Sequence, residues 1–127
     1  MIAQILIGED NADIALLLQE FLSAKGHLVV VAMDGFDLRQ KASAHRPHLI
    51  ITDIQMPGAY GSSVYQLLQT DPRTAVIPVI FISAHPYDKI KSLVPDSPKT
   101  RFLQKPLDFN KLQELIRELL PLGGFAP

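Results

Sequence analysis

Hydrophobic positions along the chain fall into short runs rich in β-branched residues, separated by stretches with helical spacing. Nearly every run lacks a strict alternation of apolar and polar residues, which is typical of strands buried on both faces. The pattern predicts five strands, at residues 3–7, 28–32, 48–52, 76–83 and 101–104. Pro78 lies near the start of the fourth of these, where a missing backbone N–H costs least.

Two helices are predicted from apolar residues spaced three and four apart, the pattern of a helix that faces a core. Their apolar stripes are Ile14, Leu17, Leu18, Phe21 and Leu22 in the first helix, and Leu112, Leu115, Ile116 and Leu119 in the last. Asn11 and Asp108 are suitable N-caps. Lys25 and Gly26 end the first helix, whereas Pro121 and the glycines at 123–124 end the last.

Weaker helical patterns fill the remaining intervals. One lies around Phe36, Leu38 and Ala42; a short one at 64–68 ends in the turn TDPRT; a third at 88–94 is closely bounded by prolines. Five strands alternating with five helices predict a single α/β domain, with an open parallel sheet and helices on both of its faces.

Composition narrows the class of protein. At 127 residues the chain has the length of one domain, and 47% hydrophobic with 20% charged residues is an ordinary globular composition. A formal net charge of −1 gives no general attraction to nucleic acid or to an anionic membrane. The chain has no cysteine, no apolar run of membrane-spanning length and no basic region ahead of its first apolar stretch, so we expect a cytoplasmic protein.

Polar side chains follow the predicted strands. Glu9 and Asp10 follow the first, Asp53 the third, Ser83 ends the fourth, and Lys105 follows the fifth. The carboxyl ends of parallel strands form the ligand crevice of such a sheet, so we expect these side chains to meet there. Clustered acids need a cation, and oxygen ligands without His or Cys suit Mg²⁺ or Mn²⁺. The lysine and the hydroxyl would then hold an anion, for which a phosphoryl group is the natural candidate.

Four segments carry a resemblance to a known family: ILIGEDN (5–11), ITDIQMPG (51–58), IPVIFISA (77–84) and FLQKP (102–106). In sequence and spacing they resemble the receiver domains of two-component response regulators, over about residues 2–120. The resemblance implies the flavodoxin-like (βα)5 fold, with a sheet of strand order 2-1-3-4-5. It also implies a receiver domain at 1–121, followed by a C-terminal tail at 122–127.

The resemblance further implies a phosphotransfer site. Asp53 matches the aspartate that accepts a phosphoryl group from a histidine kinase or a histidine phosphotransfer protein. Asp10, Asp53 and the backbone carbonyl of Gln55 match the Mg²⁺ ligands, and Glu9 would act through a bound water. Such a domain catalyses its own phosphorylation and dephosphorylation and turns over no separate substrate.

The remaining implied roles concern signalling. Lys105 would pair with the phosphoryl oxygens, and Ser83 would donate a hydrogen bond to one of them. Ser83 and Phe102 match the residue pair that switches the surface on phosphorylation, so a downstream protein or a second copy would bind through the face at 86–120. Phe102 is equally consistent with an ordinary core position.

Other functions remain open from the residues alone. If Asp53 is considered without its neighbours, a turn-forming acid is the better interpretation. The same fold also occurs in pseudo-receivers, which bind partners without phosphorylation. A Mg²⁺-dependent aspartyl phosphohydrolase is less well supported, because the position two residues after Asp53 is Gln55, which cannot act as a general acid or base. Nucleotide-binding glycine motifs are absent from the sequence. Whether the chain stands alone or is part of a larger protein is open too.

Overall fold

The computed structural model describes residues 2–56 and 59–120, and its main feature is one parallel sheet. The strands are β1 (Gln4–Gly8), β2 (Leu28–Ala32), β3 (Leu49–Asp53), β6 (Val79–Ser83) and β7 (Thr100–Gln104). Their order across the sheet is β2-β1-β3-β6-β7, and every neighbouring pair is parallel. Counted along the chain this is the order 2-1-3-4-5, so the predicted flavodoxin-like fold is confirmed.

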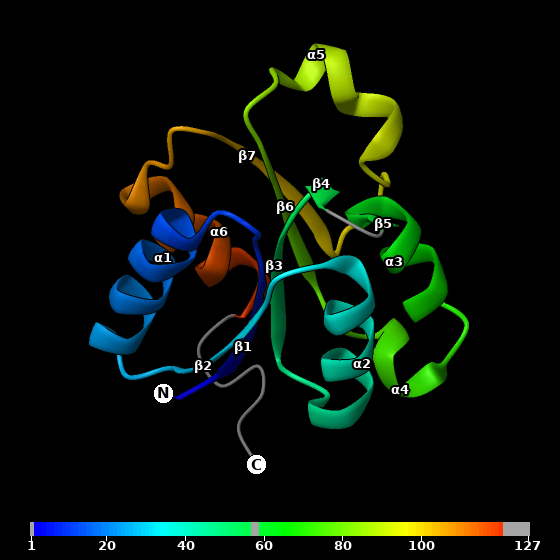
Figure 1. Ribbon diagram of the computed structural model, residues 1–127, viewed down its shortest axis with the longest axis horizontal. Helices are drawn as coiled ribbons and strands as arrows, with labels where there is room; N and C mark the ends of the chain where they lie inside the picture. Colours follow the sequence, from blue (N-terminus) through cyan, green and yellow to red (C-terminus); the bar gives the residue numbers. More distant parts are fainter. Residues whose placement is uncertain (1, 57–58, 121–127) are drawn as a thin grey trace.

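Helices cover both faces of the sheet (Figure 1). On one face lie α1 (Ala12–Ala24) and α6 (Phe109–Leu119). The other carries α2 (Gly35–His45), α3 (Gly61–Leu68), α4 (Pro72–Ala75), α5 (Tyr87–Ile90) and the 3-10 turn η1 (Lys91–Leu93). Two separate apolar clusters result, one on each side of the sheet. The double burial explains why the strands lack an apolar–polar alternation.

The caps of the first and last helices are as predicted. The side chain of Asn11 accepts hydrogen bonds from the N–H groups of Asp13 and Ile14, and Asp108 accepts from Asn110 and Lys111. Gly26 has φ +92°, a left-handed conformation that only glycine adopts without cost. These local signals fix where α1 and α6 lie along the chain.

Several predicted boundaries and one core position were wrong. The fourth strand of the sheet begins at Val79 and not at residue 76, because Val76 closes α4. The segment TDPRT is not a plain turn: Asp71 caps α4 and Pro72 occupies its first position, which suits a helix start. Leu17 was expected on the core-facing stripe of the first helix, but this residue is 54% exposed. It lies at the edge of that stripe, next to the fully buried Leu18.

Two short segments differ from the predicted pattern. The segment predicted to be helical at 88–94 divides into α5 and η1, with prolines on both sides. The sequence pattern did not predict β4 (Gln55–Met56) and β5 (Ala59–Tyr60), which form an antiparallel pair immediately after β3. Pro57 and Gly58, whose sequence predicts a turn, lie outside the described residues, as do the predicted helix-ending residues at 121–124 and the predicted tail at 122–127. Within 2–56 and 59–120, no helix is long and apolar enough to span a membrane.

Candidate functional site

Three acids meet at the carboxyl edge of the sheet. Glu9 and Asp10 directly follow β1, and Asp53 is the last residue of β3, the strand that pairs with β1. One carboxylate oxygen from each acid lies within 4.8 Å of the others. The two strands therefore end at a common point, as the sequence predicted, and hold three potential negative charges there.

Lys105 supplies the nearest positive charge. It follows β7, and its Nζ lies 2.6 Å from Oδ2 of Asp53 and 2.8 Å from Oε1 of Glu9. Its backbone N–H donates to the carbonyl oxygen of Ser83 at 2.7 Å, which ties the residue to the end of β6. The Lys105–Pro106 peptide bond is cis. One ammonium thus forms ion pairs with two carboxylates.

Asp53 is held from two sides. Its Oδ1 accepts the backbone N–H of Gln55 at 2.9 Å, and its Oδ2 accepts from Lys105. The hydroxyl of the buried Thr52 donates to the carbonyl oxygen of Asp53 at 3.0 Å. The side chain of Asp53 is 11% exposed, so its carboxylate is fixed in orientation at the mouth of the site.

Glu9 is completely buried. Its Oε2 accepts the backbone N–H of Asn11 at 3.1 Å, and its Oε1 has the ion pair with Lys105 but no well-directed hydrogen bond. Burial raises the pKa of Glu9, although the ammonium of Lys105 and the N–H of Asn11 act in the opposite direction. Burial alone would lower the pKa of Lys105, but its hydrogen bonds and charge interactions with Asp53 and Glu9 together raise it.

The donor set fits a hard divalent cation. All the candidate ligand atoms are carboxylate oxygens, and Asp10 is exposed, which leaves one side of the cluster open to water. Oxygen ligands with retained waters are the environment that Mg²⁺ favours. A cation there would also lower the repulsion among the three acids, and it would give the buried Oε1 of Glu9 a second positive neighbour.

The remaining predicted residues lie beside this cluster. Ser83 is buried, and its Oγ accepts the backbone N–H of His85 at 3.0 Å. Phe102 is half-buried in β7, and its ring centroid is 5.4 Å from that of Tyr87, at the start of α5. The structure therefore places Ser83 and Phe102 on adjacent strands, with the Phe102 ring in contact with the segment that follows β6.

Two contributors escaped the sequence analysis. Gly8 pairs with Thr52 across β1 and β3, and a Cβ at Gly8 would lie 2.6 Å from Oγ1 of Thr52. Only glycine lets the two strand ends approach so closely. A glycine within a strand is itself a signal of close backbone approach, but the sequence does not show which side chain requires it.

The fold and site together define a class: a flavodoxin-like domain with an acid cluster, a lysine and a hydroxyl at the carboxyl edge of its sheet. A family model for the response regulator receiver domain matches residues 5–117. The chain belongs to this family and is a receiver domain of the two-component response regulator type.

Relatives and solved structures agree with this assignment. The chain is 36% identical over 121 residues to response regulator PleD of Caulobacter vibrioides, covering 94% of this chain but only 26% of PleD, about a quarter of its length. The receiver domain of a histidine kinase from Syntrophus aciditrophicus is 28% identical, with TM-score 0.79 and coverage of 98% and 94%. The receiver domain of sensor histidine kinase PA1611 from Pseudomonas aeruginosa, which holds a magnesium ion in its active-site cleft, has TM-score 0.84 at 20% identity, covering 94% and 98%.

Proposed function

We propose that Asp53 accepts a phosphoryl group from a phosphohistidine of a kinase or phosphotransfer protein. The observation that carries the proposal is the position of Asp53, fixed by Gln55 and Lys105 and within 4.8 Å of two further acids. The N–P bond of the donor breaks as an O–P bond forms to a carboxylate oxygen of Asp53. The departing imidazole nitrogen keeps the electron pair of the broken bond.

Each neighbour has a chemical task in this proposal. The ammonium of Lys105 already lies between Asp53 and Glu9, where it can form an ion pair with the oxygens of an incoming phosphoryl group. Asp10, Asp53 and the backbone carbonyl of Gln55 would hold Mg²⁺ or Mn²⁺, with Glu9 acting through water. The cation supplies positive charge that offsets the charge on the phosphoryl oxygens. The hydroxyl of Ser83 would donate a hydrogen bond to one of those oxygens.

The proposal also includes how phosphorylation changes the surface that binds a partner. Phosphorylation would draw the hydroxyl of Ser83 toward Asp53 and change the position of the Phe102 ring, which now packs on Tyr87. The face at 86–120 would then bind a downstream protein or a second copy. We place the exchange in the cytoplasm, because the phosphohistidine of such kinases is made from cytoplasmic ATP.

Intact-mass spectrometry tests the phosphoacceptor. A small phosphodonor such as acetyl phosphate, with Mg²⁺, should add about 80 Da, the mass of one PO₃H, as an aspartyl phosphate. Asp53→Asn should gain nothing, whereas the nearby Asp13→Asn should behave as wild type. Equal mass gain in wild type and Asp53→Asn would show that another residue is the nucleophile. If no protein gains mass, even with a phosphorylated histidine phosphotransfer domain as donor, the chain is a pseudo-receiver.

A further inference from the structure

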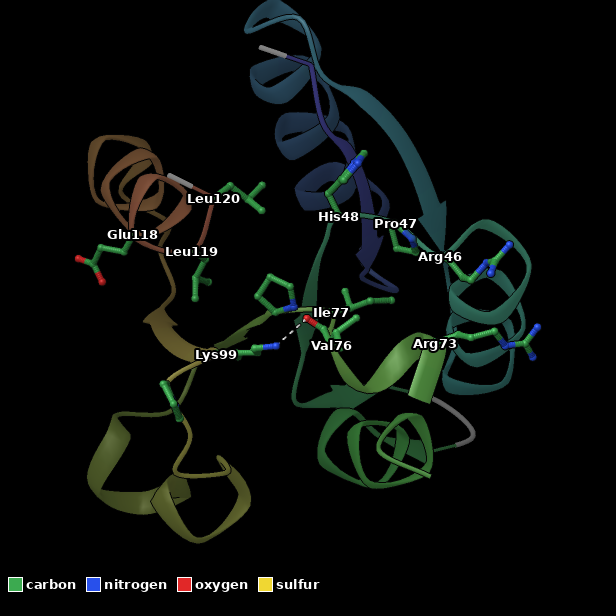
Figure 2. Close-up of a pocket in the computed structure, with 12 residues that line it drawn as sticks. Arg46, Pro47, His48, Arg73, Val76, Ile77, Lys99, Glu118, Leu119 and Leu120 are labelled. Carbon is green, nitrogen blue, oxygen red and sulfur yellow. Dashed lines mark hydrogen bonds between the residues drawn. The ribbon is translucent and has the colours of Figure 1, made fainter. Parts of the chain in front are cut away.

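A second candidate site lies at the opposite end of the sheet, where β3, β6 and β7 begin. It is a hollow of about 480 Å³, which we call the basal hollow. The segments that precede these strands supply most of its walls, including Arg46, Arg73, Val76, Pro78 and Lys99. The end of α6 supplies the rest, including Leu119 (Figure 2). None of these residues takes part in the acid cluster.

The rim of the basal hollow is positively charged. Among the described residues that line it are three cations, Arg46, Arg73 and Lys99, and one acid, Glu118, while Asp71 lies beside the rim as the partner of Arg73. Glu118 is already paired with Arg101 at 2.8 Å. Because the whole chain has a formal net charge of −1, this local excess of positive charge is not a general property of the surface.

Arg46 is the least satisfied of these cations. Arg73 is paired with Asp71 at 3.1 Å, and Lys99 donates to the carbonyl oxygen of Val76 at 3.4 Å, as the dashed line in Figure 2 shows. Across residues 2–56 and 59–120, Arg46 forms no ion pair of 4.0 Å or less. Its charge helps to lower the pKa of the exposed Asp71, but among the described residues its guanidinium forms no hydrogen bond, so its donors are available to a binding partner.

The backbone of Arg46 gives an independent observation. With φ 45° and ψ 64° it is the non-glycine residue with positive φ in the described chain, at the C-cap of α2. Glycine is the usual residue at such a position, and a side chain there costs roughly 1–2 kcal/mol. Strained positions of this kind are enriched where the side chain has a function.

The floor of the basal hollow is apolar and open. Val76 is 59% exposed, and Pro78 and Leu119 are half-buried. In Figure 2 the side chains of Arg46 and Arg73 lie on one side of Val76, whereas Lys99 lies on the other. Small-molecule sites usually enclose most of their ligand. An exposed apolar floor between cations is better matched by a protein segment with acids on both sides of one apolar side chain.

We propose that the basal hollow binds an acidic peptide segment of a partner protein, with one apolar residue on Val76 and flanking carboxylates on Arg46, Arg73 and Lys99. The charge complementarity and the order of charges across the hollow carry this proposal. The binding surface is separate from Asp53 and does not depend on phosphorylation.

Amide NMR titration of the full 127-residue chain tests the proposal. The probe is the peptide acetyl-Asp-Glu-Leu-Glu-Asp-amide, compared with its Asn-Gln-Leu-Gln-Asn and Asp-Glu-Ala-Glu-Asp analogues. We expect shifts at residues 46, 73, 76–77 and 99, weaker binding by both analogues, and weaker binding as salt shortens the Debye length from about 10 Å at 0.1 M to about 3 Å at 1 M. The Asp53→Asn variant should bind the probe as wild type does.

Arg46→Gly is the decisive variant, because glycine suits the positive φ and the fold is retained. Its affinity for the probe should fall about three- to fivefold, the effect expected of one exposed charge pair, while its melting temperature stays equal or rises. Lys111→Gln, an exposed cation at the other end of α6, should leave the affinity unchanged. The proposal is overturned if Arg46→Gly binds as wild type, if the neutral analogue binds equally well, or if acetate alone gives the same shifts at the same affinity.

Discussion

Lys105 donates a hydrogen bond to Asp53 across 52 residues of sequence, with 2.6 Å between Nζ and Oδ2. The same ammonium lies 2.8 Å from the fully buried Glu9, so it joins the ends of β1 and β3 to the end of β7. One side chain therefore supports the structure of the site and, in the proposed function, its chemistry.

Removing the ammonium should destabilise the protein. In Lys105→Met two acids stay buried or nearly buried without their cation, so we expect the free energy of unfolding at pH 7 to fall by about 2–4 kcal/mol. Urea unfolding in metal-free buffer measures this. The exposed Lys111→Met is the matched control and should stay within about 0.5 kcal/mol of wild type. If both variants lose the same stability, the ion pairs of Lys105 contribute little.

Stability should depend on pH through Glu9. The pKa of Glu9 is raised in the folded state above its ordinary value of 4.5. Between these two pKa values the folded protein therefore binds more protons than the unfolded chain does. Stability from this group is therefore greatest below pH 4.5 and is lost as the pH rises through the raised pKa. Glu9→Gln lacks this titration.

The measurement compares urea unfolding of wild type and Glu9→Gln in EDTA from pH 4 to pH 8. The stability of wild type minus that of Glu9→Gln should decrease steadily as the pH rises. A difference that is constant with pH would mean that the ammonium of Lys105 balances the burial of the carboxylate, and one that increases would mean that the ammonium outweighs it.

Divalent cations should stabilise the protein through the acid cluster. We expect Mg²⁺ to raise the melting temperature of wild type in a concentration-dependent manner, because a ligand bound only to the folded state stabilises it by mass action. Because Asp10→Asn removes a charged ligand, the Mg²⁺ concentration needed for the same rise in melting temperature should increase at least about tenfold. Asp13→Asn, an acid nearby in the first turn of α1, is the control. Equal responses of wild type and Asp10→Asn would count against the cation site.

The close approach of β1 and β3 should make Gly8 intolerant of a side chain. A Cβ there would meet Oγ1 of Thr52 at 2.6 Å and Leu38 and Met56 at 3.2 Å, so Gly8→Ala should cost about 1–3 kcal/mol. Gly8→Ala combined with Thr52→Ser, which removes only the methyl group, should remain impaired, because the contact is with the hydroxyl oxygen. Gly8→Ala with Thr52→Ala should recover part of the loss. A double-mutant cycle without coupling would show that the strands move apart at no cost.

Phosphorylation should change the face at 86–120. Hydrogen exchange with and without beryllofluoride, a mimic of the phosphoryl group, should show altered protection in residues 84–120, because the ring of Phe102 contacts the segment after β6 through Tyr87. Ser83→Ala should reduce these changes while the mimic still binds. Changes confined to the loops after β1 and β3 would contradict the proposed switch.

Local sequence signals were sufficient for the α/β class with an open parallel sheet and for the members of the acid cluster, whereas the strand order 2-1-3-4-5 followed only from the resemblance to receiver domains. β-Branched runs located the strands, and Asn11, Gly26 and Asp108 located the ends of helices, because capping and turn conformations depend on neighbouring residues. In a parallel sheet all strands end at the same edge, so residues at strand ends meet without any knowledge of packing. That is why Asp53 and Lys105 could be brought together from the sequence.

Tertiary structure alone decided the features that depend on packing between distant segments. The pattern could not show that Leu17 stays exposed, that Gly8 faces Thr52, or that the ammonium of Lys105 serves two acids. The basal hollow is a further case, because Arg46 at the end of α2, Arg73 in α4 and Lys99 before β7 share no common motif. A hollow and its charge arise from how the covering helices and loops leave space at the sheet edge, and this depends on three-dimensional distances that no local periodicity encodes.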